Sequence, residues 1–375
     1  MTKVKHLLGI SGGKDSAALA IYMKDRHPEL DIEYYTCDTG RELEETYLLI
    51  DRLNSKLGKD IELYSAIDEL NTPEESSFDH FLAMYGGYLP SSTSRWCTKK
   101  LKLDPFEQHI GNEPTISYVG IRGDEDRDGF ISTKETIQSI FPFRKNIWSE
   151  DVIKKVLDNT RINEIIQYYK EVSPDNKIES LLIYVKEPIS ESFTRKQKLL
   201  TLLDLDTIIF NKVVFKYLKT TNYPVGMLDY FPLVENDDIL VRKDIFKVLE
   251  DSGVGVPEYY LPLEYEVEID GEIKKGTYSR SRSGCFFCFF QQKIEWVWLL
   301  ETHPDLFKKA MSYEKEGYTW AEESLTDLRK AERVTQIKRN HYLKAEKNKL
   351  KNNSNKNWQD SIIEAEGEGC DSCFI

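Results

Sequence analysis

A six-residue loop near the start of the chain, Ser11-Gly12-Gly13-Lys14-Asp15-Ser16, constrains the fold more than any other feature. It follows an apolar run over 4–10 that is typical of a buried strand, and it precedes a helical pattern over 16–26. Two adjacent glycines permit a tight turn and a close backbone approach to a ligand, while the first N–H groups of the helix point at an anion. Lys14 adds a compact positive charge. The arrangement predicts a phosphate-binding loop, although a purely structural glycine turn is the alternative.

The rest of the first 135 residues repeats this alternation of strand and helix. The pattern predicts strands over 4–10, 31–37, 61–64 and 115–121 and helices over 16–26, 43–57 and 101–110. Such alternation is typical of a doubly wound parallel α/β sheet, so we expect a nucleotide-binding domain over 1–135. Three further regions are expected: a mostly helical one over 136–270, one with a C-x-x-C pair over 271–320, and a basic helix with a C-x-x-C tail over 321–375. A hairpin is predicted over 264–278, with Gly271 at its turn.

Composition limits the partners and the compartment. The formal net charge of -13 argues against a broad basic surface, but Arg329 to Lys356 contains ten Lys or Arg and only two Glu. This basic run is either a solvated helix and tail or a contact to nucleic-acid phosphate. No apolar stretch approaches the roughly 18 to 20 residues of a membrane span, and the first residues lead into the glycine turn instead of a cleavage site. We therefore expect a cytoplasmic protein with no membrane partner.

Three later segments carry polar residues suited to a nucleotide. Asp38 follows the second predicted strand and is a candidate Mg²⁺ or nucleotide contact, or else a cap of the next helix. Arg95 and Lys102 belong to a run of four cations that favours an anion. After the fourth strand, Gly120, Arg122 and Arg127 lie among carboxylates, where arginine can clamp phosphate or form structural ion pairs. Because ligands of open α/β sheets bind beyond the carboxyl ends of the strands, we expect the loops after the first two strands to face one nucleotide together.

Together, the loop and these three segments resemble the PAPS reductase and N-type ATP pyrophosphatase superfamily, whose fold is adenine nucleotide alpha hydrolase-like. The motifs cover roughly the first 150 residues in the family order. The resemblance implies ATP and Mg²⁺ as cofactors, with catalytic roles for Lys14, Asp15, Arg95, Lys102 and Arg122. It implies nucleotide binding by Ser11, Gly12, Gly13, Lys14, Asp15, Ser16, Asp38, Gly120, Arg122 and Arg127, with Asp38 holding Mg²⁺.

Four of the six cysteines form two C-x-x-C pairs, Cys285 with Cys288 and Cys370 with Cys373. Their spacing suits either a tetrahedral zinc site or a [4Fe-4S] cluster. Because some relatives of the superfamily carry an iron-sulfur cluster, the resemblance favours [4Fe-4S], with Cys97 as a further ligand; zinc and free redox thiols stay open. The tail differs from the Glu-Cys-Gly-Ile/Leu-His ending of sulfonucleotide reductases, which weakens a reductase interpretation.

The resemblance implies an ATP pyrophosphatase that adenylates an acceptor oxygen for sulfur incorporation. Ser-Gly-Gly-Lys-Asp-Ser, Arg-Trp-Cys-Thr and Gly-Cys-Phe-Phe-Cys-Phe-Phe-Gln are most similar to PAPS-reductase-like proteins of DNA phosphorothioation systems, which act in anti-phage defence. The expected partners are then a cysteine desulfurase or other sulfur donor and a nucleic acid, DNA being favoured, approached through partner proteins. The alternatives are PAPS or APS reduction, tRNA thiolation, and a non-catalytic nucleotide-binding subunit of a defence complex.

Overall fold

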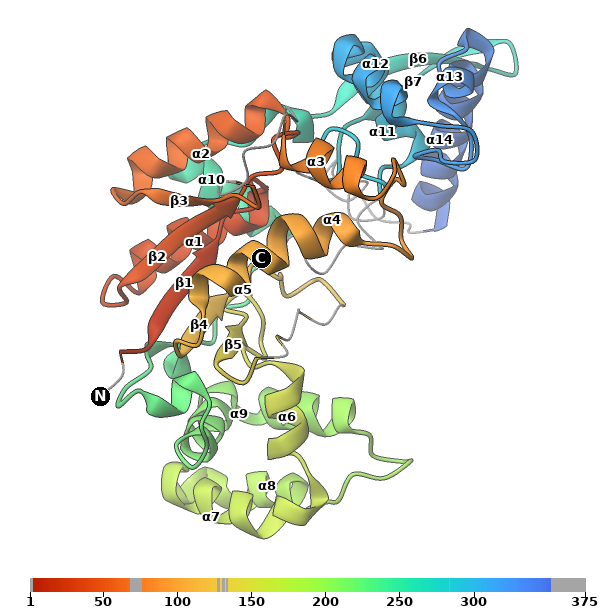
Figure 1. Cartoon of the computed structure of the whole chain (residues 1–375). Coiled ribbons are helices and arrows are strands. Elements are labelled where there is room, and N and C mark those ends of the chain that lie inside the picture. Colours follow the sequence, from red (N-terminus) through yellow and green to blue (C-terminus); the bar gives the residue numbers. More distant parts are fainter. Residues whose placement is uncertain are drawn as a thin grey trace.

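A five-stranded parallel sheet forms the centre of the computed structural model, which describes residues 3–67, 76–126, 129, 132, 134–282 and 284–351 (Figure 1). The strand order is β3-β2-β1-β4-β5, and every neighbouring pair is parallel. The strands are β1 (Lys5–Gly9), β2 (Ile32–Cys37), β3 (Ile61–Tyr64), β4 (Thr115–Tyr118) and β5 (Ile137–Ile140). From β1 the chain adds β2 and β3 on one side of the sheet and then β4 and β5 on the other, so the sheet is doubly wound, as the alternating pattern predicted.

Helices cover both faces of this sheet because successive side chains of each strand point to opposite sides. Leu8 belongs to the core shared with α1 (Lys14–Arg26) and α2 (Glu44–Leu57). Its neighbour Leu7 instead packs in a second core with Phe106 of α5 (Asp104–Ile110). Both leucines are at most 1% exposed, so each face of the sheet is closed to solvent.

Strand β5 was not predicted from the sequence, which indicated a helical region from residue 136. Only Ile137-Gln138-Ser139-Ile140 forms it, and the two central residues are polar. All four are nevertheless buried, because β4 pairs with one edge of the strand and the helical region covers it. A strand this short has no periodicity that a sequence pattern can reveal.

Most of the helical region lies beyond the β4–β5 side of the sheet, whereas its last helix lies among the helices that cover the sheet (Figure 1). It contains α6 (Glu150–Val156), α7 (Ile162–Val172), α8 (Asp175–Lys186), α9 (Arg195–Leu218) and α10 (Arg242–Asp251), with short 3-10 turns η2 (Asn159–Arg161), η3 (Pro224–Met227) and η4 (Pro232–Glu235). Helix α10 returns to pack against α1, and α9 shares the core of that face of the sheet. The helical region is thus continuous with the core of the sheet.

The remaining elements gather at the other end of the molecule (Figure 1). They are α3 (Ser77–Met84), α4 (Trp96–Thr98), a π-helix η1 (Lys99–Leu103), η5 (Glu258–Tyr260), β6 (Leu263–Ile269), β7 (Glu272–Tyr278), α11 (Lys293–Thr302), α12 (Pro304–Tyr313), α13 (Leu325–Leu328) and α14 (Ala331–Lys351). The predicted hairpin is confirmed: β6 and β7 pair antiparallel through a turn with positive φ at Asp270 and Gly271. Aromatic rings join α3 and α4 to the C-x-x-C segment, where Phe287 lies 4.3 Å from Phe78 and 4.8 Å from Trp320 between ring centroids.

Within the described residues, no helix is both long enough and apolar enough to cross a membrane.

Candidate nucleotide-binding site

The phosphate loop, residues 11–16, connects the carboxyl end of β1 to the first turn of α1. Gly12 adopts a φ of +71°, and a Cβ there would lie 2.2 Å from Thr46 Cγ2, so glycine is required. The hydroxyl groups of Ser11 and Ser16 lie 3.1 Å apart and fix the two ends of the loop. No side chain caps the start of α1 at Gly13, which leaves the first turn suited to an anion.

Lys14 and Asp15 are buried in the first turn of α1, only 2% and 3% exposed. Their charged groups lie 3.2 Å apart, and the Lys14 ammonium sits over the Tyr260 ring at 4.8 Å from its centroid. Although burial alone would raise it, the pKa of Asp15 is held well below its usual range by Lys14 and Arg122. Asp15 therefore stays ionised and supplies a fixed negative charge beside Lys14.

Arg122 follows β4 and is paired with three carboxylates. It is 2% exposed, and its guanidinium contacts Asp15 at 2.9 Å, Asp124 at 2.9 Å and Glu125 at 2.8 Å. The structure thus places Arg122 beside the phosphate loop through its ion pair with Asp15. Of the two roles that the sequence left open for this arginine, phosphate clamping and structural ion pairing, this geometry is the ion pairing. Gly120 enforces this approach, since a Cβ there would lie 2.9 Å from the Asp15 backbone oxygen.

The turn after β2 meets the C-x-x-C segment at the same edge of the sheet. Asp38 accepts hydrogen bonds from Gly40 N at 2.7 Å and Tyr47 Oη at 2.9 Å, which stabilise this turn. Cys285 forms an antiparallel bridge with Glu42, and its Sγ lies 3.2 Å from Thr39 Oγ1. The Cys285 thiol therefore lies against the loop after β2. Strand β2 is the neighbour of β1, which leads into the phosphate loop.

Burial determines the ionisation of the groups in this turn. Burial and the neighbouring Asp38 carboxylate raise the pKa of Glu42 to about 7. Burial, together with Glu42, also raises the pKa of the Cys285 thiol well above its usual value, although Lys102 acts in the opposite direction. The Cys285 sulfur is therefore a thiol rather than a thiolate at neutral pH.

Two residues of the site escaped sequence reasoning. Tyr259, in η5, donates a hydrogen bond to the Gly12 carbonyl at 2.9 Å, so an element 247 positions later holds the phosphate loop. Arg280 is fully buried between the rings of Tyr259 and Trp298 and donates to the Cys285 carbonyl at 3.0 Å. In the part of the chain that the structure describes, its Nε and Nη1 have no hydrogen-bond partner. Neither residue belongs to a recognisable motif, so only the fold identifies them.

Arg95 and Lys102 lie in the segment that leads from α4 into the π-helix. The Arg95 guanidinium stands 5.2 Å from the centroid of the Phe290 ring, which places it beside the C-x-x-C segment. Lys102 accepts a hydrogen bond at its carbonyl from Cys37 Sγ at 3.6 Å. Burial raises the pKa of both Cys37 and Cys285, and the positive charge of Lys102 partly opposes this rise at both thiols. π-Helical turns are frequent at functional sites, and here the turn carries Lys102 toward the thiols.

The predicted metal ligands are only partly described. Cys97, Cys285 and Cys288 form no disulfide within the described residues, whereas Cys370, Cys373 and the nucleotide candidate Arg127 lie outside them. No group of three or more His, Cys, Asp or Glu in the described part of the chain could hold a metal ion. These residues by themselves therefore do not offer the donor set of a zinc or [4Fe-4S] site.

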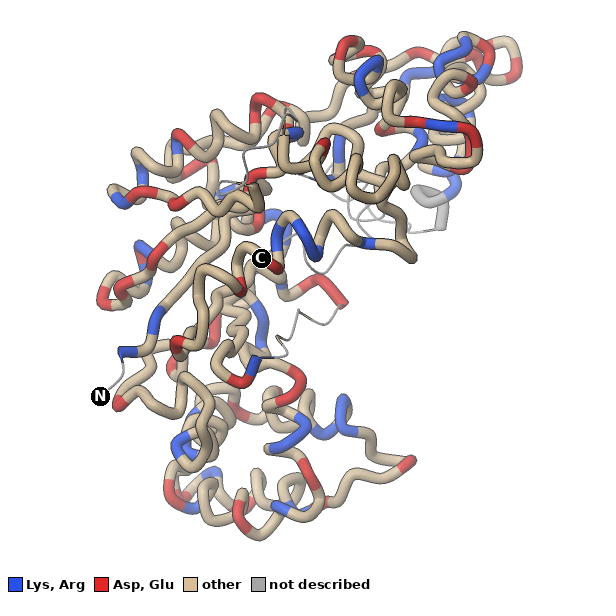
Figure 2. The backbone as a smooth tube through the Cα atoms, viewed as in Figure 1, with Lys and Arg blue, Asp and Glu red and all other residues tan. Residues whose placement is uncertain are grey.

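The basic run begins at the end of α13 and continues along α14 (Figure 2). Several of its cations have acidic partners within the chain: Arg333 with Glu323, Lys338 with Glu301, and Arg339 with Asp270 at 3.8 Å. These pairs tie the first half of α14 to neighbouring elements.

A phosphate loop at the point where strand order reverses defines a nucleotide-binding α/β domain. Residues 5–145 match the phosphoadenosine phosphosulfate reductase domain family. This match supports the PAPS reductase and PP-loop superfamily that the motifs indicated, and with it a nucleotide-binding enzyme family concerned with sulfur. The search of curated proteins finds no match to the chain.

Proposed function

We propose that the chain is an ATP pyrophosphatase that adenylates an acceptor oxygen so that sulfur can replace it. The observation that carries this proposal is the Cys285 thiol, 3.2 Å from Thr39 Oγ1 in the turn that follows β2. The phosphate loop follows the adjacent strand β1, so nucleotide phosphates and a sulfur group would share one edge of the sheet. A thiol at this edge would lie where sulfur could meet an acceptor activated by the nucleotide.

The residues of the loop suit attack at the α-phosphorus. The amides of Gly13 and the first turn of α1 would bind phosphate oxygens, and Lys14 would balance charge that develops on the leaving group. Asp15, fixed by Arg122, would keep the Lys14 ammonium in position. Mg²⁺ held with the help of Asp38 would neutralise the departing pyrophosphate.

The reaction balances without an oxidant. The acceptor oxygen forms a bond to the α-phosphorus while the bond to the β-phosphate oxygen breaks, and pyrophosphate leaves with the electron pair. A sulfur nucleophile at the sulfide level then attacks the activated acceptor centre, and AMP departs with the oxygen. Arg280 would position the C-x-x-C segment, because it donates a hydrogen bond to the Cys285 carbonyl at 3.0 Å.

We further propose that the acceptor is a DNA backbone phosphate, as in phosphorothioate modification linked to anti-phage defence. The motif resemblance and the basic run favour this acceptor, with a cysteine desulfurase or other sulfur donor as partner. Because a desulfurase delivers sulfur as a persulfide, a thiol reductant would supply the two electrons that bring this sulfur to the sulfide level. The ion pairs of α14 leave less positive charge for DNA than the sequence suggested, which favours an approach through partner proteins.

Sulfonucleotide reduction is the second candidate, because the matched family is that of phosphoadenosine phosphosulfate reductase domains. A reductase would release sulfite from PAPS or APS with a thiol reductant and would not consume ATP. The two candidates thus differ in their nucleotide and in their product.

The test is pyrophosphate release from ATP by the anaerobically purified full chain, with DNA, with tRNA and with neither. We expect stimulation by DNA and a loss of about 100-fold or more in Lys14→Ala. Lys24→Ala, at the far end of the same helix, is the matched control and should retain activity. Cys285→Ser should retain pyrophosphate release but lose incorporation of labelled sulfur, whereas Cys37→Ser should lose neither.

Other outcomes identify the alternatives. Stimulation by tRNA alone would indicate tRNA thiolation, and sulfite from PAPS or APS without ATP would indicate a reductase. Nucleotide binding without either product would indicate a non-catalytic subunit.

A further inference from the structure

A surface of exposed tyrosines lies at the end of α3 (Figure 1). Tyr85, Tyr88 and Tyr318 are 42%, 38% and 44% exposed. The Tyr88 N–H donates to the Tyr85 carbonyl at 3.1 Å and closes a tight turn through two glycines with positive φ, so these two residues are near neighbours. The rings of Tyr88 and Tyr318 lie 5.2 Å apart between centroids, and Tyr85 stacks on the buried Trp96 at the same distance. The three side chains form one surface, which we call the tyrosine surface.

Positive charge lies beside the tyrosine surface. Residues 81–103 contain four Lys or Arg and no Asp or Glu, in a chain whose net charge is -13. Arg95 and Lys99 are exposed and flank the tryptophan that underlies the tyrosine surface. Lys99 and Lys100 share the carboxylate of Asp104 at 2.8 Å each, which leaves one of these two charges in excess. The segment therefore presents a net positive charge next to the tyrosines.

Lys315 brings a further cation from a distant part of the chain. Its ammonium donates to the Gly86 carbonyl at 3.2 Å, in the turn between the first two tyrosines. Gly87 makes room for this side chain, because a Cβ there would lie 2.1 Å from the Lys315 Nζ. Neither Lys315 nor Arg95 has a carboxylate partner among the residues that the structure describes. Exposed rings beside such cations suit single-stranded nucleic acid, since bases stack on the rings and phosphates pair with the cations.

Arg95 also connects the tyrosine surface to the candidate site. Its guanidinium and that of Arg282 lie 5.2 Å and 5.1 Å from the centroid of one ring, that of Phe290. The two guanidinium groups are therefore no farther apart than the sum of these distances. Phe290 follows Cys288 by two residues. A strand that leaves the tyrosines past Arg95 would thus bring its phosphates to the C-x-x-C segment, where the Cys285 thiol contacts the β2 turn.

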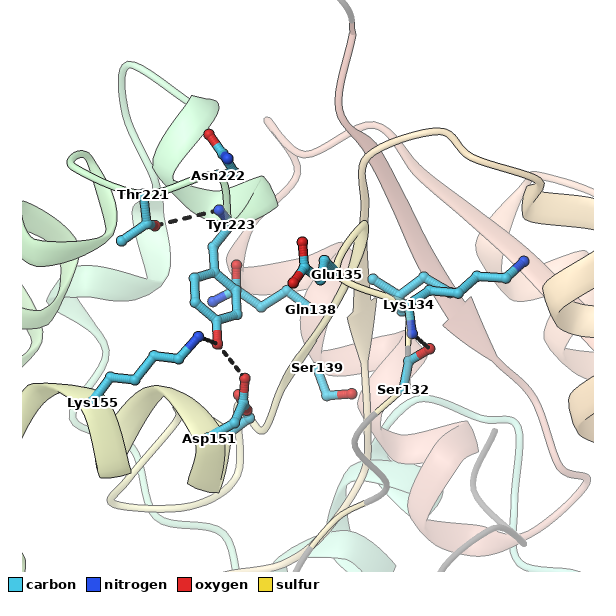
Figure 3. Close-up of a pocket in the computed structure, with 12 residues that line it drawn as sticks. Ser132, Lys134, Glu135, Gln138, Ser139, Asp151, Lys155, Thr221, Asn222 and Tyr223 are labelled. Atoms are coloured by element: carbon cyan, nitrogen blue, oxygen red, sulfur yellow. Dashed lines mark hydrogen bonds between the residues drawn. The ribbon is translucent and has the colours of Figure 1, made fainter.

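The cavity beside strand β5 arranges the same residue types differently (Figure 3). Its volume is about 410 Å³, and one face of its tyrosine, Tyr223, is covered by the Lys155 ammonium at 4.7 Å from the ring centroid. The Tyr223 hydroxyl donates to Asp151, and Glu135 lines the same wall. Because two carboxylates would repel a phosphate backbone and the ring is covered, this cavity does not suit a nucleic-acid strand.

We propose that the tyrosine surface binds an unpaired stretch of the acceptor DNA strand, with bases stacked on Tyr88 and Tyr318 and phosphates on Arg95 and Lys315. This inference rests on the proposed function, because it states how the acceptor of that reaction is held. Bases inside a duplex offer no open face to an aromatic ring, so duplex DNA would contact only the cations. Those cations are too few for tight binding of a duplex, which depends on many phosphate contacts.

Fluorescence anisotropy with a labelled oligothymidine of about 15 nucleotides, in the absence of ATP, tests the proposal. The comparison ligands are the same strand paired with its complement and the matching RNA strand. We expect the full chain to bind the DNA single strand about tenfold or more tightly than the duplex. Tyr88→Ala and Tyr318→Ala should each weaken this binding about tenfold, since each stacked base contributes an affinity of that size, whereas Tyr318→Phe should retain it.

Matched controls separate stacking and charge from effects on the fold. Tyr230→Ala removes a tyrosine that is 67% exposed but lies in the helical region, and it should leave binding unchanged. Lys315→Gln should weaken binding and lower its salt dependence, whereas Lys155→Gln, at the cavity beside β5, should change neither. Thermal unfolding of each variant shows whether the fold is retained. If a tyrosine variant fails to fold, equal binding by the two lysine variants would still contradict the proposal.

Several results would overturn the assignment. These are equal affinity for the single strand and the duplex, unchanged binding in natively folded Tyr88→Ala and Tyr318→Ala, or the same loss in Tyr230→Ala. Tighter binding of the RNA strand would assign the surface to RNA instead of DNA. No binding of either strand at micromolar concentration would leave the surface to a protein partner.

Failure of this inference is distinguishable from failure of the proposed activity. Strand binding is measured without ATP and should be unchanged in Lys14→Ala. Pyrophosphate release without strand binding would contradict only the role of the tyrosine surface. Strand binding without pyrophosphate release would contradict only the proposed activity.

Discussion

Replacing Tyr259 by Phe removes one hydroxyl group from the support of the phosphate loop and leaves the aromatic ring in place. In the native protein this hydroxyl donates to the Gly12 carbonyl at 2.9 Å, and Tyr259 is only 1% exposed. A buried hydrogen bond of this kind contributes about 1 kcal/mol, and an acceptor left unsatisfied adds a desolvation cost. We therefore expect a loss of about 1–2 kcal/mol in the free energy of unfolding.

Tyr35→Phe is the matched control. Tyr35 is equally buried, but its hydroxyl has no hydrogen-bond partner in the described structure, so its removal should be neutral or slightly stabilising. Urea unfolding measures the stability of both variants, and calorimetry measures ATP affinity. Tyr259→Phe should also weaken ATP binding by about 5- to 30-fold, since 1.4 kcal/mol corresponds to tenfold. If both variants behave alike, Tyr259 does not hold the loop.

Three further substitutions test the site. Gly120→Ala places a Cβ 2.9 Å from the Asp15 oxygen and should abolish measurable ATP binding in calorimetry, whereas Gly58→Ala, with open space around it, should only lower thermal stability. Arg122→Met leaves three carboxylates without their buried cation and should cost about 3–5 kcal/mol in urea unfolding; a loss under 1 kcal/mol would contradict the ion-pair assignment. Because the pKa of Glu42 is raised from 4.5 to about 7, its protonation favours the folded state, and that stability is lost as pH rises through this window. Between pH 4.5 and about pH 7, the free energy of unfolding of the wild type in urea should fall by up to about 3 kcal/mol relative to that of Glu42→Gln. The same pH dependence in both proteins would refute the raised pKa.

Local patterns made most of the α/β domain predictable. The run that becomes β1, the glycines after it and the helix over 14–26 are neighbours in sequence, so their geometry depends on adjacent residues. The same holds for the hairpin, whose turn conformation follows from Asp270 and Gly271. Strand β5 was missed because its polar residues are buried by the packing of the helical region over them, and no periodicity in the sequence indicates that burial.

Only part of the candidate site could be predicted, because several of its residues come from segments that are far from the phosphate loop in the sequence. The phosphate loop and Gly120 follow strands of one sheet, and strand order alone brings them together. Nothing in the sequence indicates that Cys285 pairs with Glu42, that Arg280 is buried behind it, or that Tyr259 reaches Gly12. Those contacts depend on how the last third of the chain packs, which a pattern of spacing does not specify.

The contact from Tyr259 to Gly12 also has a consequence for biosynthesis. Domains generally fold from the N-terminal side as the chain leaves the ribosome, and all five strands of the sheet have been made once residue 140 has emerged. The hydroxyl that holds the phosphate loop is made more than a hundred residues later, and the segment that covers the β2 turn later still. A nascent chain thus contains every strand of the sheet long before it contains the residue that holds the loop, so the last third of the protein completes the site in time as well as in space.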